Sequence, residues 1–184
     1  MGILRWLLGA GGEEREPVEE PKPILQTEDG IVLRRMCWET DAEAVCSFQD
    51  DVYSSNFPDF RMTAHFMDGF RFDLRKGLAS PDHGVFVLED AGRVVGFLWI
   101  VLYVSHWTRE RYGYVNNVYV LADYRRRGLG RVLLEHTDRF LQERGVREAR
   151  LTVTASNSAA VNLYEQAGYE VARYEMIKRQ AGAS

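Results

Sequence analysis

The segment 114–144 restricts the fold of this chain more than any other part of the sequence. Residues 114–121 form a run of β-prone side chains, and residues 128–144 repeat apolar side chains at helical spacing, with Gly145 after them as a stop signal. Only a short turn with three consecutive arginines separates the two. A strand that leads through a tight turn into an amphipathic helix is half of a β-α-β unit. We therefore predict an α/β domain with a right-handed crossover through this helix.

The remaining hydrophobic pattern predicts a mixed, mainly antiparallel sheet flanked by helices. Apolar runs on either side of Asp90–Gly92 indicate a hairpin, and a capping box at Thr40–Glu43 indicates the start of a helix. Strands are expected at 31–36, 84–89, 93–104, 114–121, 149–154 and 169–178. Helices are expected at 40–51, 63–76, 128–144 and 158–167, with a loop at 52–61.

The N-terminal residues differ in composition from the rest of the chain. Residues 1–30 carry three basic and seven acidic side chains and three of the five prolines, so we predict a flexible acidic arm there and one domain at 31–180. The whole chain has 23 basic and 27 acidic residues, a balance that indicates no nucleic-acid partner, and we expect no membrane span. Because Cys37 and Cys46 lack the spacing of metal ligands, we expect two buried thiols, no metal site and a cytoplasmic location.

The arginine-rich turn before the long helix has the properties of an anion site. A helix start presents unpaired backbone N–H groups and the positive end of the helix dipole, and Gly128 and Gly130 would let phosphate oxygens approach the backbone. The alternative is a solvated basic turn or a weak nucleic-acid patch. The turn is neither a Walker loop nor a dinucleotide fingerprint, because it lacks both glycine patterns. The side chains that would add positive charge are Arg125, Arg126, Arg127 and Arg131.

Three motifs resemble those of the GNAT superfamily of acetyl-CoA-dependent N-acyltransferases. They are Arg125-x-x-Gly128-x-Gly130 before a helix, then 151–157, then 162–169. The segment 118–169 is similar to the ribosomal-protein alanine N-acetyltransferase branch. The resemblance implies a GNAT-like fold with the β-α-β crossover at the cofactor site and acetyl-CoA as co-substrate. The residues it implies for cofactor binding are Val118, Tyr119 and Val120 along the pantetheine arm, Arg125, Arg126, Arg127, Gly128, Leu129, Gly130 and Arg131 at the pyrophosphate, and Asn157.

The resemblance also implies that Tyr164 donates a proton to the departing thiolate. Aminolysis of a thioester needs a neutral amine, a stabilised oxyanion and a proton for the leaving sulfur. A phenol has a pKa of about 10 and is protonated at neutral pH, so it can serve as that acid. Read without the motif, Tyr164 would be a core residue and Asn157 a helix N-cap. We predict direct transfer of acetyl to a primary amine, without a covalent enzyme intermediate.

The resemblance to the alanine-acetylating branch does not extend to the general base. The alanine-acetylating branch has a glutamate five residues before the motif asparagine, and Thr152 occupies that position here. A hydroxyl cannot take a proton from an ammonium group near neutral pH, which leaves a non-catalytic acyl-CoA-binding module as the alternative function. The other candidate bases are His106, Glu110, Asp123, or a water molecule held by Asn116 and Asn117.

The acceptor is expected to be a small-molecule amine or a peptide N-terminus. Several aromatic side chains either line its site or pack the edge of the domain. An exposed final strand at 169–178 would pair across a homodimer. The aromatic residues in question are Tyr53, Phe57, Phe60, Trp107 and Tyr112.

Overall fold

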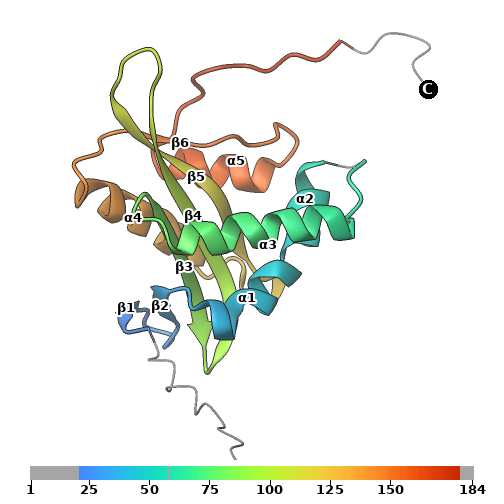
Figure 1. The fold of residues 1–184 in the computed structure, drawn as a ribbon, viewed down its shortest axis with the longest axis vertical. Coiled ribbons are helices and arrows are strands. Elements are labelled where there is room, and N and C mark those ends of the chain that lie inside the picture. The colour runs from blue at the N-terminus through green and yellow to red at the C-terminus, as the bar shows by residue number, and fades with distance from the viewer. Residues whose placement is uncertain (1–20, 58, 179–184) are drawn as a thin grey trace, which may run out of the picture.

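The computed structural model describes residues 21–57 and 59–178, which form one six-stranded sheet with helices on both faces (Figure 1). The strands, in both chain and sheet order, are β1 Pro23–Gln26, β2 Val32–Arg35, β3 His83–Asp90, β4 Arg93–Val104, β5 Arg111–Val120 and β6 Ala149–Arg150. The helices are α1 Trp38–Ser47, α2 Gln49–Asn56, α3 Ala64–Leu78, α4 Leu129–Gln142 and α5 Ser158–Gln166, and a short 3-10 turn, Ala122–Tyr124, precedes α4.

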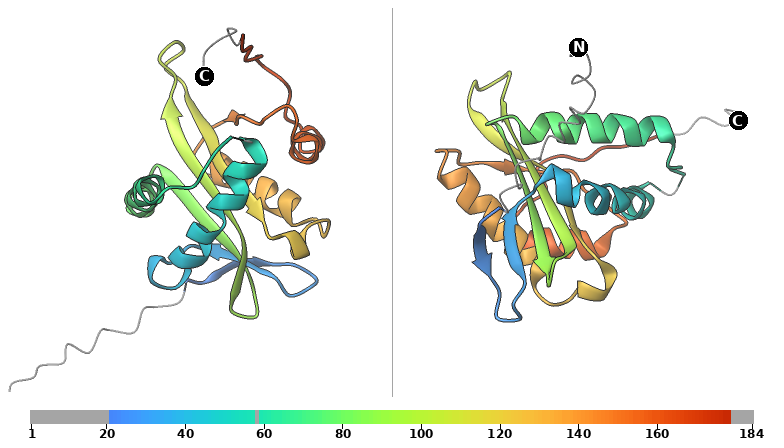
Figure 2. Two further views of the ribbon diagram at one scale, coloured as in Figure 1. Left: turned by 90° about the vertical axis from the view of Figure 1, so that its right-hand side faces the viewer. Right: turned by 60° about the horizontal axis from the view of Figure 1, so that its bottom comes forward.

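The sheet has the mixed character that the sequence predicts. Neighbouring strands are antiparallel from β1 to β5, and only β5 and β6 are parallel. The connection from β5 to β6 passes through α4, as expected for a β-α-β crossover. The predicted fold class is therefore confirmed. Figure 2 shows α3 on one side of the sheet and α4 and α5 on the other.

Strand β4 separates two hydrophobic cores. Its residues 94–102 are all buried, which is why this strand is a continuous apolar run in the sequence. Leu98 and Ile100 belong to the core beneath α4, whereas Phe97 and Trp99 belong to the core beneath α1 and α3. Both predicted thiols are buried and free.

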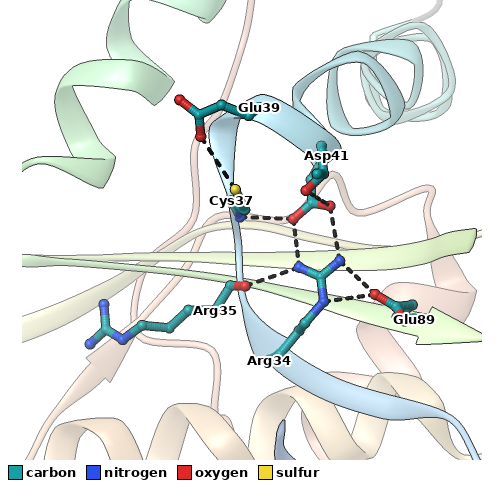
Figure 3. Close-up of polar contacts among 7 residues, drawn as sticks. Arg34, Arg35, Cys37, Glu39, Asp41 and Glu89 are labelled. Atoms are coloured by element: carbon teal, nitrogen blue, oxygen red, sulfur yellow. Dashed lines mark hydrogen bonds and ion pairs between the residues drawn. The ribbon is translucent and has the colours of Figure 1, made fainter. Parts of the chain in front are cut away.

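Helix α1 begins two residues before the predicted capping box. The carboxylate of Asp41 accepts a hydrogen bond from the backbone N–H of Cys37 (2.8 Å) and two more from the guanidinium of Arg34 (2.6 and 2.9 Å). Arg34 also bonds Glu89 on β3 (Figure 3). The N-cap of α1 is Cys37, whose backbone N–H bonds Asp41, and Thr40 lies inside the helix, so the capping-box prediction is wrong.

Two other segments depart from the predictions. Helix α2 occupies part of the expected loop at 52–61, because its side chains make long-range contacts described below. β1 lies inside the expected flexible arm and pairs with β2, while residues 1–20 of that arm lie outside the described residues.

The expected last two strands are also shorter or missing. β6 ends at Arg150 instead of 154, and the described residues 169–178 form no strand. The apolar side chains of this final segment point to solvent, and Figure 1 shows the chain leaving the sheet after α5. Residues 169–178 pair with no described strand and most of their apolar side chains lie in solvent, so the predicted strand is wrong for the described chain.

Candidate functional site

The edge of β5 that faces β6 is open for most of its length. β6 pairs with β5 only at Gly113 and Tyr114, and no described strand lies along that edge at 115–120. The backbone N–H of Leu121 donates to Val95 of β4. Because alternate residues of a strand point their peptide groups to opposite edges, those of Val118 and Val120 face the open edge, and those of Tyr119 face β4.

A β-bulge interrupts the pairing of β5 with β4 at the start of this open stretch. Trp99 pairs with Asn117 and Ile100 with Val115, so Asn116 is the extra residue. The amide of Asn116 donates to Asn117 (2.9 Å). The two asparagines therefore bond one another at the bulge.

The turn after β5 forms a concave helix entry. Arg126 and Gly128 both have left-handed backbone conformations, with φ of 63° and 77°. A Cβ at Gly128 would meet nothing within 4 Å, so the space in front of the turn is open. Helix α4 begins at Leu129 without a side-chain cap, and its first N–H groups remain available to an anion.

Gly130 has a packing role that the sequence did not predict. A Cβ there would stand 2.9 Å from the side chain of Leu163, so this glycine allows α5 to pack closely on the start of α4. Tyr164 follows Leu163 in α5, so the contact joins the helix that bears Tyr164 to the start of α4. Of the two glycines, Gly128 has open space where a Cβ would stand, whereas Gly130 faces Leu163.

The arginines of the turn are partly engaged within the chain. Arg125 donates to the carbonyl of Val120 and lies over the ring of Tyr119. Arg127 pairs with Asp29 of the β1–β2 turn (2.9 Å), and Arg131 pairs with Glu135 (2.8 Å). Arg126 makes no side-chain hydrogen bond or ion pair with another described residue. These pairs are exposed and weak, so an incoming phosphate group can compete for the guanidinium groups.

Asn157 and Tyr164 are positioned by α5. The side chain of Asn157 accepts from the N–H of Ala160 and caps the helix, as its type alone suggests. Burial raises the pKa of the Tyr164 hydroxyl, and its ring meets that of Tyr169 edge to face with centroids 5.8 Å apart. Tyr164 is therefore a protonated phenol at neutral pH.

Helix α2 bonds both β5 and the chain after β6. On one side the hydroxyl of Tyr119 donates to Asp51 (2.7 Å), and burial followed by this hydrogen bond raises its pKa to about 12. On the other side Asn56 accepts from the hydroxyl of Thr154 (3.0 Å) and from the amide of Asn157 (3.3 Å). Sequence analysis missed Asn56, since nothing in its local pattern distinguishes it from a loop residue.

None of the candidate bases is brought beside Tyr164 by a contact in the described chain. The hydroxyl of Thr152 accepts from Tyr114 (3.0 Å), while His106 and Glu110 are exposed in the loop between β4 and β5. Asp123 is exposed beyond the other end of β5. Of the predicted acceptor residues, Tyr53, Phe57 and Phe60 cluster with Phe66, Trp107 is 88% exposed, and Tyr112 stacks with Tyr103.

Residues 43–169 match the profile of the acetyltransferase (GNAT) family. This chain belongs to the GNAT family. It is 31% identical over 157 residues to a mycothiol acetyltransferase of Amycolatopsis mediterranei, covering 84% of this chain and 50% of that protein. It is 52% identical over 56 residues to the ribosomal protein bS18 alanine N-acetyltransferase of Escherichia coli, covering 30% of this chain and 38% of that enzyme. The chain thus spans half or less of these two relatives.

Solved GNAT structures share the fold. The GCN5-related N-acetyltransferase of Ralstonia eutropha has a TM-score of 0.64 and 26% identity, over 83% of this chain and all of that one. AAC(6')-Iy, solved with a bisubstrate analog of CoA, has a TM-score of 0.62 and 20% identity, over 82% of this chain and 97% of that one. The predicted GNAT family is confirmed, and the acetyltransferases of this family use acetyl-CoA. No described helix of this GNAT chain is long and apolar enough to cross a membrane.

Proposed function

We propose that this chain transfers the acetyl group of acetyl-CoA to a primary amine by direct attack, with Tyr164 as the general acid. The observation that carries the proposal is the packing of Leu163 on Gly130, because it joins the helix that bears the phenol to the start of α4. The open edge of β5 leads into that same helix start. A strand edge, an anion site and an acid therefore adjoin one another.

The coenzyme-binding roles follow from the positions of the peptide groups. Val118 and Val120 offer N–H and C=O groups to the amides of the pantetheine arm, in the manner of an added strand. The pyrophosphate would lie on the free N–H groups from Gly128 to Arg131, with positive charge from Arg126 and its neighbours. Tyr119 supports this site indirectly, because its ring holds Arg125. Asn157 contributes indirectly, because its side chain caps α5, the helix that bears Tyr164.

Tyr164 can serve as the acid because a phenol is protonated at neutral pH. A departing thiolate has a conjugate acid with a pKa of about 8.5, below that of a phenol at about 10, and burial raises the pKa of Tyr164 further, so proton transfer to sulfur is uphill and needs a short, fixed hydrogen bond. The packing of α5 on α4 would supply that geometry. Neither cysteine is near these elements, which supports direct transfer over an acyl-enzyme.

The proposal is tested by thiol release from acetyl-CoA across a panel of amines, with Tyr164→Phe beside wild type. We expect Tyr164→Phe to lower kcat about 100-fold and to leave CoA affinity by calorimetry unchanged. Tyr169→Phe is the matched control, because it removes a neighbouring phenol whose hydroxyl has no partner among the described residues. CoA binding without turnover of any amine would favour the non-catalytic module, and equal rates in both variants would refute the role of Tyr164.

A further inference from the structure

Tyr119 contacts both the arginine turn, residues 125–128, and the start of helix α2. The Cζ atom of Arg125 lies 5.6 Å from the centroid of the Tyr119 ring. The ring of Phe48 stacks with that of Tyr119, with centroids 4.8 Å apart, and the Tyr119 hydroxyl donates to Asp51 (2.7 Å). Tyr119 is only 7% exposed, so its position is fixed by the side chains around it. One buried side chain therefore joins a predicted phosphate-binding arginine to α2.

The contacts of Tyr119 hold the first turn of α2. Phe48 is the N-cap of this helix, and Asp51 follows three residues later, so both side chains lie on one face of the helix. Among the eight described residues of α2, only Gln49 is buried. A helix with so little buried surface is held mainly by its individual contacts and can shift when one of them is lost. The bond between Tyr119 and Asp51 is one of these contacts.

The last turn of α2 holds the start of α5. The backbone carbonyl of Asn56 accepts from the hydroxyl of Thr154 (3.0 Å), and its side-chain oxygen accepts from the amide of Asn157 (3.3 Å). The oxygen of the same Asn157 amide accepts from the N–H of Ala160 and caps α5 (3.2 Å). Asn157 thus bonds α2 with one atom of its amide and α5 with the other. The position of α2 therefore bears on the helix that carries Tyr164.

A second assembly of the same kind lies beside the arginine turn and leads to the sheet instead of to α2. The hydroxyl of Tyr124 donates to Asp90 (2.8 Å), and Arg127 lies over the Tyr124 ring at 5.2 Å. Asp90 is the last residue of β3, within the sheet. Each assembly has an arginine, a phenol and a carboxylate, and they differ in the element that bears the carboxylate. Removal of the two hydroxyls in turn separates an effect on α2 from the loss of one hydrogen bond.

We infer that Tyr119 and Asp51 are positioning residues that link coenzyme binding at the arginine turn to helix α2 and, through Asn56, to the start of α5. This inference rests on the proposed function, which places the phosphates of the coenzyme at the arginine turn. A phosphate that binds Arg125 holds the guanidinium over the Tyr119 ring, and the ring holds the hydroxyl on Asp51. Two sites joined in this way share a coupling free energy, so the coenzyme stabilises α2 in its place.

The link is tested by amide hydrogen exchange with and without saturating CoA. We expect CoA to slow exchange in α2 about fivefold in wild type, the lower end of usual couplings between sites. Tyr119→Phe removes the hydroxyl but keeps the ring beneath Arg125, so α2 should lose this protection while the first turn of α4 retains it. Tyr124→Phe is the matched control and should behave as wild type. Asp51→Ala should reproduce the loss, whereas Asp51→Asn, which still offers an oxygen to the phenol, should retain most of the protection.

The consequence for catalysis is tested by thiol release from acetyl-CoA with an amine that the wild type acetylates. Tyr119→Phe should lower kcat about fivefold, and Tyr124→Phe should not. CoA affinity by calorimetry should change less than about twofold in both, because α2 is already in place without the coenzyme and binding has little to shift. Such a split between kcat and affinity would not result from general destabilisation of the fold, which both variants share.

The possible failures are distinguishable. Unchanged CoA-dependent protection of α2 in Tyr119→Phe, or its equal loss in Tyr124→Phe, would overturn the inference. So would a wild type that binds CoA and acetylates an amine without any protection of α2, and acetyl transfer would then stand. Equal kcat values in the two variants would refute the link from α2 to α5. If no amine is acetylated, the proposed function fails, whatever the exchange rates show.

Discussion

His136 should make this protein less stable as the pH falls from 6.5 to 4. The side chain lies on the buried face of α4, is 6% exposed, and neither ring nitrogen has a hydrogen-bond partner among the described residues. Its ring meets that of Phe86 edge to face at 4.2 Å. Burial, followed by the charge of Arg139 and against the opposing charge of Glu143, lowers its pKa from 6.5 to about 4. Arg35 and Arg144 act in the same direction as Arg139.

The sign follows from the proton count in the two states. The unfolded chain protonates His136 near pH 6.5 and the folded chain only near pH 4, so the unfolded state binds more protons between these values. Stability from the neutral form is complete above pH 6.5 and is lost as the pH falls through this window. At about 1.36 kcal/mol per pKa unit the full loss approaches about 3 kcal/mol, of which about 2 kcal/mol is gone at pH 5.

Urea denaturation followed by circular dichroism at pH 7.5 and pH 5.0 measures this loss. His136→Gln removes the titration but keeps a polar side chain, so its free energy of unfolding should fall about 2 kcal/mol less than that of wild type between the two pH values. His136→Leu should show the same reduced pH dependence. Its free energy of unfolding should also be about 1 kcal/mol higher at both pH values, because the substitution removes a buried polar group without a partner. His65→Gln, at an exposed position of α3, is the control. If His136→Gln retains the pH dependence of wild type, the reasoning is wrong.

Three further changes have expected outcomes. Asp41→Asn leaves the buried guanidinium of Arg34 without its main partner, so the free energy of unfolding should fall by about 3 kcal/mol in urea titrations; a loss below about 1 kcal/mol would contradict the importance of this pair. Gly130→Ala brings a methyl group against Leu163 and should displace α5, lowering kcat several-fold while CoA affinity by calorimetry changes little. Ile177 is 72% exposed in the final segment. If that segment pairs across a homodimer, Ile177→Lys should yield monomers in light scattering. A monomeric wild type would rule the dimer out.

The sequence predicted most reliably what local pattern determines. β5, the turn after it and α4 lie where expected, because each is determined by side chains close to it in the sequence. α4 has a helical apolar period and ends before Gly145. The stop of the helix before Gly145, which has a φ of 66°, has the same local origin. The family followed from motifs in this same part of the chain. Local pattern thus suffices for the crossover.

What the sequence missed depends on contacts between distant residues. Helix α2 is held by Asp51 on Tyr119 and by the cluster of Tyr53 with Phe66, which no window of neighbouring residues reveals. The start of α1 depends on Arg34, which lies on strand β2. The packing of Leu163 on Gly130 could not be predicted either, because a glycine that admits a phosphate and one that admits a helix have the same sequence pattern.

The two attachments of α2 have a consequence for how ligands come and go. This helix touches β5 at one end and the loop before α5 at the other. A long molecule along the free edge of β5 would therefore enter lengthwise, or from the side only after the hydrogen bonds of Asn56 break. Entry and exit rates of the coenzyme would then depend on a residue that touches none of its phosphates. Asn56 would set the residence time of CoA on the protein more than its equilibrium affinity.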